Sequence, residues 1–265
     1  MALLASGNAR VKDARKLSRR SERAEHRLFL ADGPKAVAGA LTVPGCVVEV
    51  FATVDATDQY DDLAAATVAA GAPWTLLEDR ALASVSDSVS PAGVVAVCRF
   101  VDRPLVDLLA TERQLVAICA EVRDPGNAGT VIRSADAAGA EVVVLSGTSV
   151  DLYNPKTVRA AVGSVFHLPI AVELDPAAAV RAAQEAGLVV LAADGAGEID
   201  LHDAGDLLRA PTAWLFGNEA RGLPPELRDL ADHRVRIPLH GRAESLNLST
   251  AAAVCLYASA RAQRR

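Results

Sequence analysis

The stretch that decides the fold is LFGNEARGLP at residues 215–224, followed by VRIPL at 235–239 and ESLNLSTAAA at 244–253. The apolar runs at the start of the first two segments have the length of buried strands. Each run opens into a loop of small and polar residues, where Gly217 and Gly222 allow a sharp turn and close approach to a ligand. Because ligands bind at the carboxyl ends of strands in open parallel sheets, we expect a binding site here.

These loops also carry the polar side chains that a site needs. Asn218 and Glu219 supply an amide and a carboxylate, and Ser245 and Asn247 supply a hydroxyl and a second amide. A helix is predicted to start near Asn247 and to run into the C-terminus, since Asn is a favourable residue at a helix start.

A second segment upstream predicts a strand, a turn and a helix. The run 115–120 is a buried strand, the helix covers Thr130–Ala138, and another strand covers Glu141–Leu145. A dinucleotide-binding fold is the obvious alternative for such a unit. However, GNAG at 126–129 is not Gly-x-Gly-x-x-Gly, and no acidic residue closes the next strand, so the sequence argues against a nucleotide-dependent oxidoreductase.

Together with NAGTVIR at 127–133, the three C-terminal segments resemble the motifs of the SpoU family in order, spacing and residue type. Members of that family are RNA ribose 2′-O-methyltransferases of the knotted SPOUT class, and they use S-adenosylmethionine. The resemblance covers residues 105–265 closely and the N-terminal third more loosely. It implies an α/β fold with a trefoil-knotted, parallel-sheet C-terminal domain. It also implies a homodimer with the first-motif helix and the C-terminal helix near the interface.

The resemblance also implies which residues do the chemistry. Arg133 is the expected catalytic residue, Asn127 positions it, and Glu219 steadies the site. Ser245 and Asn247 match the polar pair of the third motif. Taken by itself, Arg133 could instead pair with Asp136 three residues later on the helix surface. Because a free guanidinium has a pKa above ~12, the role of Arg133 as proton acceptor or electrostatic stabiliser stays open.

S-adenosylmethionine is the cofactor that the resemblance implies. In the family it is held largely through backbone groups of the second and third motifs. The matching positions here are Gly217, Asn218, Ile237 and Leu246. Composition alone would place Ile237 and Leu246 in the core. No Cys/His cluster has zinc spacing, and we expect no metal.

Charge is distributed unevenly along the chain. The net charge is −6, yet the first 30 residues hold eight Lys/Arg against three Asp/Glu, which leaves −11 for the remainder. Residues 6–25 are predicted to form one basic helix. A basic arm on an acidic body suits docking on a polyanion. An ordinary solvated helix face is the alternative.

The N-terminal third alternates short strands and helices, which predicts a small α/β unit. The segment Phe29–Lys35 and the run SPAGVV at 90–95 resemble the family's substrate-binding domain, a ribosomal-protein-like fold. Pro104 breaks the preceding strand, so we expect an RNA-binding domain at 1–103 and the methyltransferase domain at 104–265.

Further on, Lys156 and Arg159 lie three residues apart on a predicted helix, where they either shape the RNA side of the cleft or are surface charges.

The composition limits the classes of protein to which the chain can belong. Apolar residues make up 51% of the chain, enough for a sizeable core, and no apolar run approaches the ~20 residues of a membrane span. The N-terminus has no apolar signal region, and four cysteines are scattered singly. We therefore expect a cytoplasmic protein with reduced core thiols.

The resemblance implies methylation of a ribose in RNA, and the N-terminal substrate-binding domain favours ribosomal RNA as the substrate. Transfer RNA is an alternative substrate. A non-catalytic RNA-binding protein on the same fold is a second alternative, in which the basic arm would carry the function. His240 and Arg242 follow the second motif strand, where they face RNA or solvent.

Overall fold

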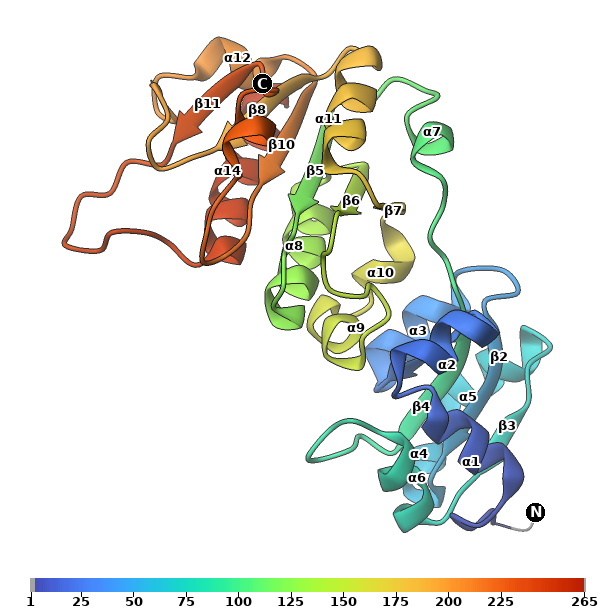
Figure 1. Cartoon of the computed structure of the whole chain (residues 1–265). Coiled ribbons are helices and arrows are strands. Elements are labelled where there is room, and N and C mark those ends of the chain that lie inside the picture. The colour runs from blue at the N-terminus through green and yellow to red at the C-terminus, as the bar shows by residue number, and fades with distance from the viewer. Residues whose placement is uncertain (1–2, 265) are drawn as a thin grey trace. The chain divides into compact units, whose positions relative to one another are not determined.

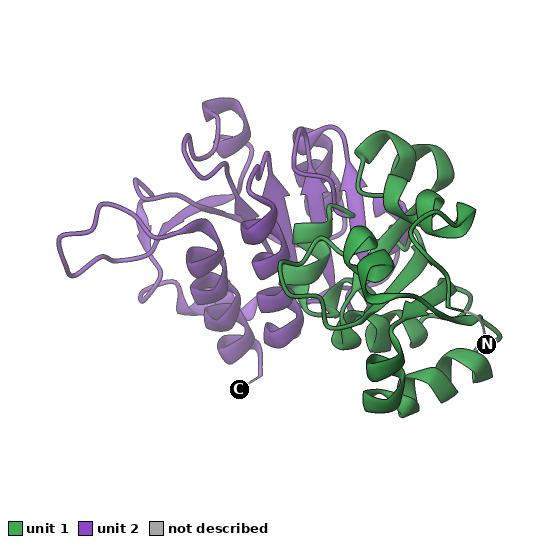
Figure 2. Ribbon diagram, turned by 90° about the horizontal axis from the view of Figure 1, so that it is seen from below, with its two compact units in different colours: residues 1–101, 153–167 green, residues 102–152, 168–265 purple. Residues whose placement is uncertain are grey.

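The structure is a computed structural model that describes residues 3–264 and divides into two compact units (Figure 2). Unit 1 comprises Met1–Val101 and Tyr153–His167, and unit 2 comprises Asp102–Leu152 and Leu168–Arg265. The segment Tyr153–His167 thus belongs to unit 1, although in sequence it lies between two strands of unit 2.

Unit 1 is built on a mixed four-stranded sheet (Figure 1). β4 pairs antiparallel with β1 and β2, and β3 adds parallel to β2. In spatial order the strands are β1 (Leu28–Asp32), β4 (Val94–Arg99), β2 (Val47–Ala52) and β3 (Trp74–Leu76). The helices of this unit are α1 (Ala9–Lys16), α2 (Arg20–His26), α3 (Pro34–Leu41), α4 (Val54–Gln59), α5 (Asp61–Ala69), α6 (Asp79–Val85), α9 (Pro155–Ala161) and α10 (Ser164–His167).

The prediction of one basic helix over residues 6–25 is wrong, because the structure has two helices, α1 and α2, with a turn between them. Leu17 ends α1 and is buried in the core of unit 1. The buried Arg23 then donates from Nη1 to the carbonyls of Leu17 and Ser18, at 2.8 and 2.7 Å. One of the eight basic side chains therefore fixes the turn and is withdrawn from any surface role.

Aromatic packing explains why Tyr153–His167 belongs to unit 1. Four of the chain's few aromatic rings gather there, and the rings of Phe100 and Tyr153 stack with centroids 3.8 Å apart. Phe29 contacts both Tyr153 and Phe166. The backbone N–H of Val101 also donates to the Tyr153 hydroxyl at 2.7 Å. Such contacts bury large apolar surface and hold the segment on β1 and α3.

Unit 2 is a seven-stranded sheet in which every pairing is parallel. In spatial order the strands are β7 (Ile170–Glu173), β6 (Val142–Ser146), β5 (Leu115–Ala120), β10 (Thr212–Phe216), β8 (Val189–Ala193), β11 (His233–Arg236) and β9 (Ile199–Asp200). Three neighbouring strands, β6, β5 and β10, are buried at every residue, as expected for a sheet covered on both faces. The predicted parallel α/β fold is confirmed.

Helices cover both faces of this sheet (Figure 1). Their bounds are α7 (Leu105–Leu108), α8 (Pro125–Ala138), α11 (Pro176–Glu185), α12 (Gly205–Arg209), α13 (Pro225–Arg228) and α14 (Leu248–Gln263). α14 packs along α8 and against β5 and β10, and the Trp214 indole N–H donates to Ser259 of α14 at 2.9 Å in the core. α7, α11 and α13 contribute to the apolar cluster on the opposite face. The trefoil knot that the resemblance implies stays a prediction.

The first-motif helix starts five residues earlier than the sequence predicts. Asp124 caps α8 by accepting from the backbone N–H of Asn127 at 2.8 Å, and Pro125 occupies the first helical position. Asn127 therefore lies in the first turn of a helix instead of in a loop. The regular backbone of α8 therefore fixes the position of the Asn127 side-chain amide.

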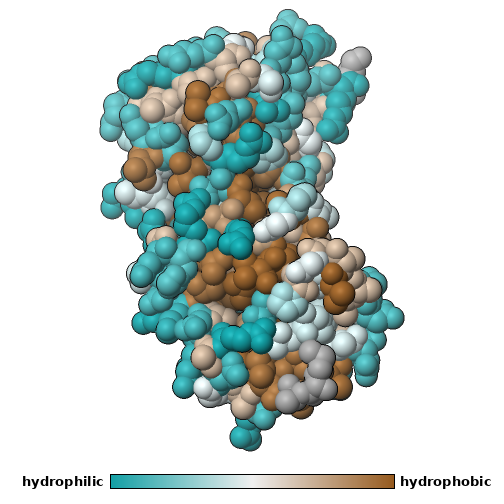
Figure 3. All heavy atoms as spheres, turned by 90° about the vertical axis from the view of Figure 1, so that its right-hand side faces the viewer, coloured by the Kyte–Doolittle hydropathy of each residue, from teal (hydrophilic) through white to brown (hydrophobic). Residues whose placement is uncertain are grey.

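The surface is mixed in character, with hydrophilic and apolar residues both present on the face shown in Figure 3. Within residues 3–264, no helix is long and apolar enough to cross a membrane.

All four cysteines are buried free thiols, as the sequence predicted. Burial raises the pKa of the Cys119 thiol to about 12, so this group near Glu219 stays protonated and unreactive.

Candidate active site

A pocket of about 340 Å³ lies at the carboxyl ends of β8, β10 and β11 in unit 2. Parallel pairing brings these three strand ends to one edge of the sheet, although they are far apart in sequence. The pocket is lined by Ala193, Asp194, Gly195, Phe216, Gly217, Asn218, Glu219, Ala220, Gly222, Val235, Ile237, Leu239, Glu244, Ser245, Leu246, Leu248 and Ala251. All four residues predicted to bind the cofactor are among them.

The loop after β10 is a tight turn that only glycine permits at its base. Asn218 and Gly222 exchange two backbone hydrogen bonds, at 3.0 and 2.8 Å. A Cβ on Gly217 would lie 2.4 Å from the carbonyl carbon of Gly222, and Gly222 itself has φ of +66°. A side chain at Gly217 would therefore force this wall of the pocket apart.

Asn218 fixes the turn and ties it to the neighbouring strand. Its side-chain oxygen accepts from the backbone N–H groups of Ala220 and Arg221, at 3.0 and 3.2 Å. Its amide nitrogen donates to the carbonyl of Glu121 at 2.9 Å, directly after β5. Glu121 has a left-handed backbone with φ of +58°, which is uncommon for a residue other than glycine. The polar groups of Asn218 are thus used within the protein, although the residue lines the pocket.

Glu219 links the loop after β10 to the start of the first-motif helix. Its carboxylate accepts from the backbone N–H groups of Arg123 and Asp124, at 3.1 and 3.0 Å, and from the Asn127 amide at 3.2 Å. Burial raises the pKa of Glu219, but its own N–H and these three donors lower it by more, so the pKa lies below its ordinary value. The charged carboxylate therefore holds the two motifs together.

A second link joins the first-motif helix to the third motif. The Asn247 amide nitrogen donates to the Asn127 side-chain oxygen at 3.0 Å. The Asn247 oxygen caps α14 by accepting from the backbone N–H of Ser249 at 2.9 Å and from its hydroxyl at 2.7 Å. These contacts give each amide a single orientation. The hydrogen bonds all run in one direction, because Ser249 donates to Asn247, Asn247 donates to Asn127, and Asn127 donates to Glu219.

The structure brings most predicted site residues together and leaves one apart. Ser245 lies on the pocket wall, while Asn127, Glu219 and Asn247 form the chain of hydrogen bonds beside it. Arg133 lies further along α8, is exposed, and does not line the pocket. Within the described part of the chain no residue forms an ion pair with it, Asp136 included.

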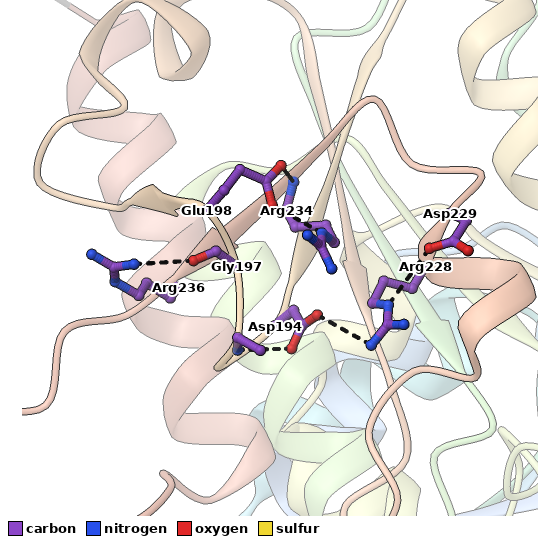
Figure 4. A network of polar contacts seen from close by, with 8 residues as sticks. Asp194, Gly197, Glu198, Arg228, Asp229, Arg234 and Arg236 are labelled. Carbon is purple, nitrogen blue, oxygen red and sulfur yellow. Dashed lines mark hydrogen bonds and ion pairs between the residues drawn. The ribbon is translucent and has the colours of Figure 1, made fainter.

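Sequence reasoning missed the loop after β8 as part of the site. Asp194 lines the pocket, and its Oδ1 accepts from the backbone N–H of Ala196 at 3.0 Å. Figure 4 shows the polar contacts around this loop. Oδ2 of Asp194 lies 3.9 Å from Nη1 of Arg228, and the Arg236 guanidinium donates to the Gly197 carbonyl at 3.2 Å. The pair Asp194-Gly195, directly after a buried strand, is the sequence feature that could have predicted this part of the site.

The site offers carboxylate, amide and hydroxyl groups, and across residues 3–264 no three His, Cys, Asp or Glu side chains are placed to hold a metal ion. Among its apolar residues, Phe216 and Val235 are buried, whereas Leu239 and Leu246 remain 40% and 36% exposed. An apolar slot with a few fixed polar groups is the usual form of a small-molecule site.

Comparison with known proteins identifies this arrangement. Residues 114–257 match the model of the SpoU rRNA methylase family, and residues 8–96 match that of the MRM3-like substrate binding domain. The chain belongs to the SpoU family. The resemblance drawn from the three motifs is confirmed, and so is the N-terminal substrate-binding domain.

Relatives share the fold over nearly the whole chain. The 23S rRNA (guanosine(2553)-2′-O)-methyltransferase RlmP of Bacillus subtilis is 35% identical, over 94% of this chain and 95% of that protein. An rRNA methyltransferase from Sinorhizobium meliloti, solved with bound AdoMet, is 36% identical with a TM-score of 0.82, covering 96% and 95% of the two chains. AviRb from Streptomyces viridochromogenes, also solved with AdoMet, is 31% identical with a TM-score of 0.83, covering 97% and 99%.

The Glu219 contacts predict a pH dependence. We expect NMR titration of the carboxyl carbon to give a pKa below the ordinary value of a glutamate, because the folded state favours the charged form. With the folded pKa lowered, the stabilisation is present above the unfolded pKa and is lost as pH falls through the folded pKa. Asn127→Ala should raise the pKa of Glu219, and Asn8→Ala in unit 1 should leave it unchanged. A wild-type pKa equal to that of an exposed glutamate, or above it, would contradict these contacts.

Proposed function

We propose that this protein transfers a methyl group from S-adenosylmethionine to the 2′-hydroxyl of a ribose in ribosomal RNA, and that it does so in the cytoplasm. The single observation that carries the proposal is the hydrogen-bonded chain of Asn247, Asn127 and Glu219 beside the pocket. It unites residues of all three family motifs in one place. The printed names of relatives that act on 23S rRNA support the choice of substrate.

The pocket suits S-adenosylmethionine in size and chemistry. Phe216, Ile237 and Leu246 offer apolar surface for the adenine, and the backbone of Gly217 is accessible because the residue has no side chain. Asp194, Glu244 and Ser245 line the same space and supply hydrogen-bond partners for a ribose or an amino-acid group. We propose Gly217, Asn218, Ile237 and Leu246 as the cofactor-binding residues.

When bound, S-adenosylmethionine supplies a methyl group on a sulfonium, which leaves as a neutral thioether. The protein must then align the RNA hydroxyl with the methyl–sulfur axis and accommodate one proton. Alignment of two reactants can contribute about 7 kcal/mol or more to lowering the barrier. The fixed chain of amides provides rigid support for such alignment because each member has one orientation.

We propose Arg133 as the catalytic cation. Its guanidinium has no ionic partner among residues 3–264 and is therefore free to pair with the target phosphate and to stabilise the developing alkoxide. Asn127, Glu219, Ser245 and Asn247 complete the proposed site. Asn127 and Glu219 act by holding the helix that carries Arg133, and Ser245 and Asn247 act by shaping the third-motif loop.

The test is transfer of a labelled methyl group to RNA separated by size, with ribose-methyl mapping of the labelled species. We expect label in large-subunit ribosomal RNA. Arg133→Ala should lower transfer by about 100-fold or more while leaving calorimetric binding of S-adenosylhomocysteine unchanged. Arg181→Ala, on the opposite face of the sheet, is the matched control. Full activity of Arg133→Ala would overturn the role of Arg133, and label only in transfer RNA would redirect the substrate.

We further propose that the protein is a homodimer whose interface contains α8 and α14. Along α14, Thr250, Val254, Tyr257 and Arg261 recur every three or four residues, so they share one face, and all four are exposed. Val254 and Tyr257 are large side chains that a second copy would cover. Because α8 carries Arg133 and α14 begins at Asn247, assembly and methyl transfer would be coupled.

Sedimentation velocity tests this assembly. The wild-type protein should sediment as a dimer, and Tyr257→Glu should shift it to monomer because a charge would be buried at the interface. Val106→Glu, at an exposed valine on α7, should leave the dimer intact. A wild-type monomer at micromolar concentration would exclude the proposed interface.

A further inference from the structure

The loop after β8, residues 194–198, is held against β11 at both of its ends. The backbone N–H of Asp194 donates to the Val235 carbonyl at 3.0 Å. At the other end, Glu198 accepts from the backbone N–H and from Nε of Arg234, at 3.2 and 2.9 Å (Figure 4). A Cβ on Gly197 would lie only 2.8 Å from the Arg234 carbonyl oxygen, so the loop lies directly on the strand. The Asp194 side chain therefore extends from a fixed backbone.

The two oxygens of the Asp194 carboxylate have different surroundings. Oδ1 accepts from the backbone N–H of Ala196 at 3.0 Å. Oδ2 is buried, has no hydrogen-bond partner among residues 3–264, and lies 3.9 Å from Nη1 of Arg228. The Asp194 side chain is nevertheless 17% exposed, and because Oδ2 is inaccessible, this exposed area belongs to the rest of the side chain. Since Asp194 lines the pocket, Oδ1 is the oxygen that can meet a ligand.

Arg228 fixes this orientation from the protein side. Its Nε is also buried without a hydrogen-bond partner in the described chain, and it lies 3.7 Å from Oδ1 of Asp229. A nearby guanidinium balances the charge of a partly buried carboxylate, so Arg228 attracts Oδ2 of Asp194 and leaves Oδ1 turned to the pocket. A carboxylate oxygen has two lone pairs, and the Ala196 N–H uses one of those on Oδ1. One acceptor position is therefore free for a ligand.

The methyl donor carries three kinds of hydrogen-bond donor: the α-ammonium, the adenine amino group and the ribose hydroxyls. Arg228 argues against the ammonium, because a second cation would then share the carboxylate that already lies 3.9 Å from Nη1. The adenine is expected against the apolar residues Ile237 and Leu246. A neutral hydroxyl remains, and dinucleotide-binding sheets use an acidic side chain in the same way to bind a ribose hydroxyl.

We propose that Asp194 accepts a hydrogen bond from a ribose hydroxyl of S-adenosylmethionine, and that Arg228 holds the carboxylate in the orientation that this contact needs. The inference rests on the proposed function, because it takes this pocket as the cofactor site. The four residues proposed above to bind the cofactor offer it backbone groups and apolar surface. Asp194 adds a charged side chain that recognises the sugar.

The test is calorimetric titration, without RNA, of S-adenosylhomocysteine and of its analogue that lacks both ribose hydroxyls. Asp194→Asn and Asp194→Ala should each raise the Kd of S-adenosylhomocysteine by about tenfold or more, because a hydrogen bond to a charged acceptor is lost. Wild type and variants should bind the dideoxy analogue with similar Kd values, since the contact is then missing from all of them. Circular dichroism checks that each variant is folded.

Asp229→Asn is the matched control. It makes the same chemical change to the other carboxylate near Arg228, which is exposed and outside the pocket, and it should bind S-adenosylhomocysteine like the wild type. In methyl transfer, Asp194→Asn should raise the KM for S-adenosylmethionine by a similar factor and leave kcat unchanged, because the ribose is bound equally in the ground and transition states.

Wild-type affinity for S-adenosylhomocysteine in both Asp194 variants would overturn the proposal. An equal loss of affinity for the dideoxy analogue would also overturn it, because Asp194 would then act by shaping the loop. So would a loss that disappears with the analogue lacking the α-amino group, which would assign Asp194 to the ammonium. A wild-type protein that shows the expected Asp194 dependence, yet transfers no methyl group to RNA, would instead refute the proposed function and leave the ribose contact intact.

Discussion

The active-site region depends on the carboxylate of Glu219. It stands in the loop after β10 and accepts hydrogen bonds from the residues that follow β5, so that one side chain joins two strand ends. Asn127 extends the link to Asn247 and hence to the start of α14. Hydrogen bonds to a charged acceptor are stronger than neutral ones, which explains why an exposed carboxylate can organise three loops.

The parallel sheet makes this convergence possible. β5, β10, β8 and β11 are neighbours in space, although the chain passes through β6, β7, β8 and β9 between β5 and β10. All carboxyl ends therefore meet at one edge, where the loops supply the pocket and the chain of amides. The helices on both faces exclude water from the central strands, and this leaves the loops as the place where polar chemistry can occur.

Much of this architecture was predictable from local sequence. Buried strands such as Leu115–Ala120 and Trp214–Phe216 show as short apolar runs, and the glycine at 217 marks the turn whose backbone allows no side chain. The break between α1 and α2 was not predictable from charge periodicity, because it depends on the burial of Arg23 by the tertiary fold. The role of Asp194 was equally hidden, since it follows from the pairing of β8 beside β10 and β11. The knot and the site roles rest on the family resemblance and stay predictions.

NMR mapping of backbone amides, while S-adenosylhomocysteine is added to the wild-type protein, tests whether this pocket binds the cofactor. We expect shifts concentrated in the loops 193–197, 216–222 and 235–251, which line the pocket, with secondary shifts at Asn127 through its link to Asn247. Shifts confined to other parts of the chain, or none at ligand concentrations that saturate related methyltransferases, would contradict the assignment of this pocket as the cofactor site.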